Sequence, residues 1–177
     1  MRRRLIRWEW GGAIFAAIMG TLLHFTYGWS GENQLAAVVS AVNESVWEHM
    51  KLLFVPVFFW SVVQLWFHGK DYPNFLAARA ASVLTGLTLI PALYYTYTGA
   101  LGLQLSWVNI LIFFLAVAVT FLVDCYLLST GWAGRPWQQM AGLVVLWAAA
   151  FLFVYCTFYP VELPLWQDPI TGGYGMV

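Results

Sequence analysis

The sequence predicts an all-α membrane protein, built as a bundle of about five transmembrane helices. Three observations lead to this prediction: few charged residues, five long apolar segments, and aromatic residues gathered near the segment ends. Of the 177 residues, 62% are hydrophobic and only 9% are charged, with a mean hydropathy of +0.73. A soluble domain carries about 25% charged residues, so the apolar excess must face lipid. The length suits one domain, and residues 1–177 are expected to form a single integral membrane domain.

Five apolar segments are long enough to cross a bilayer, which takes about 20 consecutive apolar residues. They run approximately over residues 10–27, 45–67, 75–97, 107–129 and 137–159. Local signals mark several ends, because Ser45 and Glu48 have the spacing of a capping box, Pro136 suits a first helical position and Pro160 stops a helix. Tryptophan and tyrosine residues cluster near the ends, as in the aromatic belts of membrane proteins.

The basic residues predict the orientation. With the N-terminus in the cytoplasm, seven of the eight basic residues fall on the cytoplasmic side and only Lys51 falls outside, which satisfies the positive-inside rule. The seven are Arg2, Arg3, Arg4, Arg7, Lys70, Arg79 and Arg135. We therefore expect a protein of the cytoplasmic (inner) membrane with its C-terminus outside. The first segment lacks a clear cleavage site and is expected to be a retained helix.

Two stretches on the outer side are not expected to span. The segment 28–43 contains an apolar run over 35–42 that is too short to cross, so we expect an interfacial or re-entrant helix there. The tail after Pro160 is rich in proline and glycine and is predicted to be non-helical. Residues 168–172 in that tail have the pattern of an Asx-type turn.

Small residues repeat along one face of the first segment and end at a histidine. Every fourth residue belongs to this face: Gly12, Ala16, Gly20, His24 and Gly28. Small residues at this spacing allow another helix to approach closely. We therefore expect His24 to face the bundle, near the outer end of its helix.

The run NESVWEHMK at residues 43–51 brings four ionisable side chains to the outer start of the second segment. A structural interpretation covers part of it: Ser45 and Glu48 cap the helix, and Lys51 pairs with Glu48. That interpretation does not account for His49, nor for the distant His24.

The outer side is acidic and contains two histidines, which would attract cations. His24, Glu44, Glu48 and His49 form a candidate ligand set for a divalent metal ion. The spacing is not H-E-x-x-H, and metal–nitrogen bonds near 2.0–2.1 Å would exclude a shared ion if the histidines lay more than about 7 Å apart. A haem between the two histidines is a further alternative that two histidines alone do not favour.

Asp124 lies within the fourth segment, where an ionisable residue is costly and is a functional candidate. The structural alternative is a buried ion pair or hydrogen bond, with Arg79 or Arg135 as the partner. Lys51 and Glu162 are the other polar residues expected to be buried, and Glu162 could pair with Lys51 or join the outer cluster.

Three stretches of the chain resemble the signature stretches of a family of small, uncharacterised prokaryotic multi-pass membrane proteins. They are residues 24–30, 43–52 and 160–169, and the second, a NESxWEHxKL-type motif, is the most distinctive. The resemblance covers nearly the whole chain. It implies a multi-pass membrane protein and implies no activity. The tryptophan-rich sensory proteins also have five helices, but their motifs are absent from this sequence.

Three functions are compatible with these features. The first is a binding or sensing module whose outer pocket, beneath the tail, holds a metal ion or a small polar ligand. The second is a metal-dependent hydrolase acting on a lipid or small substrate at the outer leaflet, with Glu44 or Glu48 as general base. The third is an accessory subunit of a larger membrane complex or an oligomer. Whether the protein is an enzyme stays open, and no nucleic-acid partner is expected.

Overall fold

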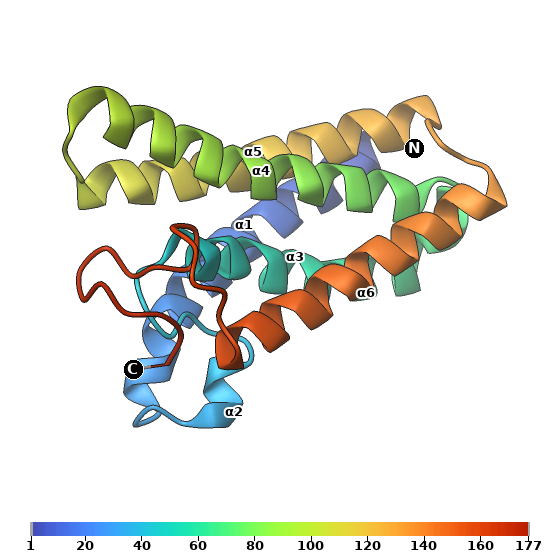
Figure 1. Ribbon diagram of the computed structural model, residues 1–177. Coiled ribbons are helices and arrows are strands. Elements are labelled where there is room, and N and C mark those ends of the chain that lie inside the picture. Colours follow the sequence, from blue (N-terminus) through green and yellow to red (C-terminus); the bar gives the residue numbers. More distant parts are fainter. Residues whose placement is uncertain (1, 177) are drawn as a thin grey trace.

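The computed structural model describes residues 2–176 and consists mainly of five long helices (Figure 1). These are α1 (Arg2–Trp29), α3 (Val46–His68), α4 (Phe75–Leu101), α5 (Ser106–Thr130) and α6 (Pro136–Phe158). A single-turn helix α2 (Gln34–Ala37) and a 3₁₀ turn η1 (Gly69–Asp71) complete the secondary structure. Within residues 2–176, the extended pairing is limited to one isolated bridge between Gln167 and Tyr174. All five long helices are long and apolar enough to cross a membrane, so the predicted fold class is confirmed.

Four of the five helices begin and end within four residues of the predicted limits. The first helix differs, because α1 begins at Arg2 and includes the basic stretch before the apolar run. The helix expected over 35–42 is also shorter than predicted, since α2 ends at Ala37. There the backbone turns away, and side chains satisfy two carbonyls: Ser40 donates to Ala36, and Lys51 donates to Ala37.

The small residues of α1 bring it close to its neighbours, α3 and α5. A Cβ atom added to Gly12 or Gly20 would clash with side chains or backbone of both α3 and α5, and Ala16 is fully buried. Gly28 has no neighbour within 4 Å. The predicted packing face is therefore confirmed from Gly12 to Gly20 and does not extend to the end of the helix.

Large apolar side chains remain exposed along all five long helices. Examples, one from each long helix in chain order, are Ile14, Trp66, Leu84, Leu122 and Phe151. A surface of this kind fits a lipid bilayer, because lipid does not penalise exposed apolar groups as water does.

The tail after α6 folds back over the end of the bundle where α1 ends and α3 begins, which we call the outer end (Figure 1). The backbone N–H of Trp47, one of the unpaired donors in the first turn of α3, donates to the carbonyl of Leu165. The indole ring of Trp47 also packs against Trp166, with ring centroids 4.8 Å apart. The Asn43 side chain donates to the carbonyl of Gly175. The tail is thus bonded to the residues that begin α3.

Within the tail, the predicted Asx-type turn is confirmed, because Asp168 Oδ1 accepts a hydrogen bond from the N–H of Ile170. The prediction that Glu162 is buried is wrong, since its side chain is exposed. It lies in a turn just after α6, and the amine of Lys51, its expected partner, is already enclosed by other groups.

A fully buried ion pair connects the segments of the outer end. Lys51 Nζ lies 2.6 Å from Glu48 Oε2, and these side chains are only 0% and 3% exposed. Lys51 also donates to Ala37 O and to the hydroxyl of Thr157 on α6. Glu48 accepts hydrogen bonds from Val42 N–H and from the Thr157 hydroxyl. The pair therefore holds the loop before α3, α3 itself and α6 together.

The capping interpretation is half right. Ser45 Oγ accepts a hydrogen bond from the N–H of Glu48, as in a capping box. The reciprocal bond is absent, because Glu48 accepts from Val42, and the Ser45 N–H donates to Asn43 instead.

Glu48→Gln is expected to lower the free energy of unfolding by about 3–5 kcal/mol, because it leaves the buried Lys51 without its counter-charge. The double variant Glu48→Gln with Lys51→Met removes both charges and should recover much of that loss. Denaturant-induced unfolding of detergent-solubilised protein, followed by circular dichroism, measures both. Glu162→Gln, at an exposed acid of the same end, is the matched control and should change stability by less than about 0.5 kcal/mol. Equal stability of the Glu48→Gln and Glu162→Gln variants would contradict this role.

Candidate functional site

Three chain segments bring a histidine, a carboxylate and a second histidine together at the outer end. His24 lies near the C-terminal end of α1, one turn beyond Gly20, where α1 packs closely against its neighbours. Glu44 belongs to the loop before α3 and directly precedes its capping residue, Ser45. His49 lies in the first turns of α3. We call His24, Glu44 and His49 the outer triad.

The glutamate of the outer triad lies between the two histidines. Glu44 Oε1 is 3.5 Å from His24 Nε2, and Glu44 Oε2 is 3.6 Å from His49 Nε2. One potential ligand atom from each residue lies within 4.8 Å of the others. The imidazole centroids of His24 and His49 are 5.5 Å apart, inside the limit of about 7 Å for a shared ion.

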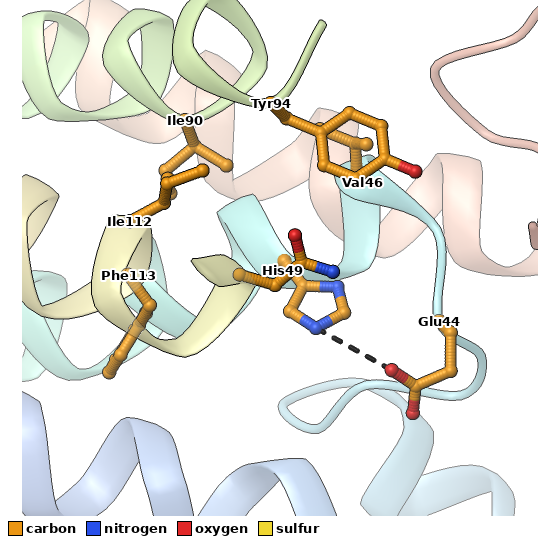
Figure 2. Close-up of a pocket in the computed structure, with 8 residues that line it drawn as sticks. Glu44, Val46, His49, Ile90, Tyr94, Ile112 and Phe113 are labelled. Carbon is orange, nitrogen blue, oxygen red and sulfur yellow. Dashed lines mark ion pairs between the residues drawn. The ribbon is translucent and has the colours of Figure 1, made fainter. Parts of the chain in front are cut away.

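Hydrogen bonding prepares His49 to act as a ligand. Its Nδ1 lies 2.9 Å from the carbonyl oxygen of Ser45 and donates to it in the neutral imidazole. The lone pair is then on Nε2, which faces Glu44 (Figure 2). Metal-binding histidines commonly donate their other ring N–H to a carbonyl in this way.

His24 has an unsatisfied polar atom, because its Nδ1 is buried without a hydrogen-bond partner. The three side chains are half-buried to partly exposed, between 22% and 41%. They are therefore shielded from bulk water and still reachable, as a ligand site requires.

The distances within the outer triad suit a tetrahedral ion better than direct hydrogen bonds. Hydrogen bonds between nitrogen and oxygen are usually 2.7–3.2 Å long. Ligands bound to zinc at 2.0–2.1 Å in a tetrahedron lie roughly 3.3–3.4 Å apart. The two histidine–carboxylate distances, 3.5 and 3.6 Å, are close to this spacing, and the three ligand atoms all lie within 4.8 Å of one another.

A cavity of about 400 Å³ lies beside the outer triad, between α1 and α5. Apolar side chains dominate its wall, with Thr21 of α1 and Ser106 and Asn109 of α5 as additional polar groups. Ile170 is the tail residue among those lining it. Figure 2 shows a smaller adjoining pocket, in which the His49 side chain lies between Glu44 on one side and Ile112 and Phe113 on the other. The triad is thus the polar end of a mainly apolar cavity.

The structure brings together three of the four expected metal ligands and directs the fourth, Glu48, elsewhere. The carboxylate of Glu48 is bonded to Lys51, Thr157 and the backbone of Val42. The spacing of Glu48 and Lys51 already favoured such a pair. The two candidate general bases therefore differ, because Glu44 belongs to the outer triad and Glu48 does not.

Asp124 lies at the opposite, inner end and is fully buried in an ion pair with Arg79. Arg79 was one of the two partners expected for Asp124. A second carboxyl group beside Arg79 was not expected: Glu9 of α1, which is 3% exposed. Glu9 precedes Gly12 and Ala16 at helical spacing. This spacing places Glu9 on the packing face of α1, and it is the sequence signal that could have identified Glu9 as buried.

One family model matches nearly the whole chain. The model of a family of unknown function, DUF6512, matches residues 2–176. No curated protein and no solved structure shows significant similarity to the chain. Its expected resemblance to an uncharacterised family is thus supported, and the chain belongs to the family of unknown function DUF6512.

Proposed function

We propose that this protein is a membrane-embedded binding or sensing module that holds a divalent metal ion, most favourably zinc, at His24, Glu44 and His49. The single observation that carries the proposal is the convergence of three metal-binding side chains from three separate segments, with ligand atoms within 4.8 Å. Imidazole and carboxylate are ligands that zinc accepts readily.

The tautomer of His49 and the charge around the outer triad support the same proposal. The Ser45 carbonyl fixes the His49 tautomer that leaves Nε2 free, and Glu44 supplies a negative charge between the histidines. The remaining net charge at the outer end is also negative, because the positive charge of Lys51 is balanced by Glu48 in their ion pair. A cation is therefore the ligand that this end of the bundle would attract.

Three protein ligands leave a fourth zinc position for water or another small molecule. The cavity beside the outer triad has room for such a ligand, and its walls are mainly apolar. A molecule with one polar group for the metal and an apolar remainder fits this arrangement best.

The open position and the cavity also favour a second function, metal-dependent hydrolysis at the outer leaflet. A bound metal would activate water for attack. This chemistry also needs a general base close to that water. Glu48 is bonded to Lys51, and Glu44 would be a metal ligand, so neither expected base is free. Binding is therefore the function that the geometry supports best.

The distribution of basic side chains supports a cytoplasmic N-terminus, with the outer triad outside. Lys51, the basic residue of the outer end, is buried in its ion pair. The exposed basic side chains in residues 3–176 are all at the inner end: Arg3, Arg4, Arg7, Lys70 and Arg135. Positive charge is retained on the cytoplasmic side of membrane proteins.

Protein purified without a chelator is expected to contain about one zinc per chain, because one triad can hold one ion. His24→Ala, His49→Ala and Glu44→Gln should each weaken zinc binding by at least about 100-fold, since each removes a direct ligand. Binding should also weaken as pH falls, because the ligand histidines must be neutral. Elemental analysis and zinc titration measure both effects.

His68→Ala is the matched control for these variants, because His68 is paired with Asp71 at the inner end. It should retain full zinc binding. Absence of stoichiometric metal, together with unchanged behaviour of His24→Ala and His49→Ala, would overturn the metal proposal.

The orientation is tested separately with reporter fusions at the C-terminus. Alkaline phosphatase, which becomes active only outside the cytoplasm, should be active there, and a fluorescent protein that folds only in the cytoplasm should stay dark. The reverse pattern would place the outer triad on the cytoplasmic side. Fusions to the loop between α5 and α6 should give opposite results and serve as the control.

A further inference from the structure

A second polar cluster lies at the inner end and is centred on Arg79. This residue of α4 is fully buried, and its Nη2 lies 2.9 Å from Asp124 Oδ2 and 3.7 Å from Glu9 Oε1. Gln64 of α3 connects the cluster, since it donates to Glu9 and accepts from Arg79. Four helices therefore contribute side chains to this cluster.

The charges of this cluster do not balance if both acids are ionised. Two carboxyl groups, Glu9 and Asp124, share one guanidinium, and all three side chains are at most 4% exposed. The other neighbours, Gln64 and Ser82, are neutral. A net negative charge in the interior of a membrane bundle is costly. One bound proton removes that charge.

The hydrogen bonds of the cluster also leave room for one proton. Glu9 Oε2 is buried without a hydrogen-bond partner. Asp124 Oδ2 is ion-paired with Arg79, but the geometry of that contact falls short of a hydrogen bond. Glu9 and Asp124 are close enough to hydrogen-bond to each other, and a proton on Glu9 would supply the donor for that bond.

Glu9 also borders a space that opens between α1 and α5. This groove has a volume of about 350 Å³, and its other lining residues are apolar or cysteine: Ile6, Trp10, Ala13, Ala118, Phe121, Leu122 and Cys125. Asp124, by contrast, is not among the residues lining it. Of the two acidic residues, Glu9 is thus the one that borders the groove.

Among the residues whose side chains the structure describes, Arg79 is the cation that acts on Glu9. From α4 it faces Arg79, from α5 Asp124, and from α3 the neutral Gln64. Among the described residues, the phenol of Tyr72, in the connection before α4, is close enough to interact with Glu9, and the thiol of Cys125 lines the same groove. His68 of α3 packs against Trp8 and is paired with Asp71.

We infer that Glu9 and Asp124 form a proton-binding site, in which the pair holds one proton and Glu9 exchanges it through the groove between α1 and α5. The site is independent of the outer triad. His49 and Gln64 are separated by 15 residues of α3, or about 22 Å along a helix. The stretch of α3 from Leu52 to Val57, which lies between them, is buried and apolar.

An apolar carbodiimide tests this inference on the intact protein in lipid vesicles. Dicyclohexylcarbodiimide partitions into membranes and reacts with a carboxylic acid only when the acid is protonated. The O–H adds across one N=C bond, the proton passes to nitrogen, and the acyl group then migrates to give a stable N-acylurea without further reagents. We expect one adduct on Glu9, located by mass spectrometry of proteolytic fragments. No adduct at Glu9, or an adduct at Asp124 instead, would overturn the inference.

Asp124→Asn provides the sharper comparison, because it removes the second carboxylate and leaves Glu9 and Arg79 balanced as an ion pair. Glu9 should then be ionised, and its labelling should fall by at least about tenfold although the residue itself is unchanged. Asp71→Asn is the matched control at an exposed acid of the inner end, and should label like the parent protein. Undiminished labelling of Glu9 in Asp124→Asn would show that no proton is shared.

Discussion

The ion pair between Lys51 and Glu48 is the interaction on which the outer end of the molecule depends. Residues 38–45 contain no helix, so their position is set by contacts with the rest of the bundle. Lys51 binds the carbonyl that ends α2, Glu48 binds the backbone N–H of Val42, and both contact Thr157 of α6. Glu44 lies two residues after Val42 in the chain. The pair therefore places a carboxylate in front of two histidines that come from different helices.

The membrane explains why the polar groups are concentrated at two levels. In lipid, an unpaired polar or charged group is costly, so ionisable side chains within the bundle are expected to have partners or a function. Glu48 and Lys51 satisfy each other almost completely, as expected of a structural pair. The outer triad and the Glu9–Asp124 pair differ, because His24 Nδ1 and Glu9 Oε2 lack partners in buried positions. These unsatisfied atoms are what separates the two candidate sites from the structural ion pair.

Patterns within single helices were sufficient to predict much of this structure. Apolar length located five helices, and the repeat from Gly12 to Gly20 identified the packing face that carries His24. The spacing of Glu48 and Lys51 suggested their ion pair. Each of these features depends on residues that are neighbours in sequence or separated by whole helical turns, so periodicity reports them directly.

Features that depend on how helices meet were harder to predict. Glu48 was expected to join the histidines, but its partner Thr157 lies 109 residues further along the chain, and nothing local to Glu48 indicates that contact. Glu9 follows four arginines in the sequence and was not named as a candidate, although its register with Gly12 turns it inward. A short helix was expected over 35–42, but its early end at Ala37 was not, because the composition of this stretch does not show that Lys51 binds the carbonyl of Ala37.

X-ray absorption spectroscopy at the zinc edge, on protein loaded with one equivalent of zinc, tests the central claim most directly. We expect a first shell of nitrogen and oxygen only, at about 2.0–2.1 Å, with the multiple-scattering signature of two imidazole rings. The matched His49→Ala protein, if it retains any zinc, should lose one imidazole from that shell. A spectrum without imidazole scattering, or one unchanged in His49→Ala, would mean that zinc binds elsewhere and that the outer triad is not its site.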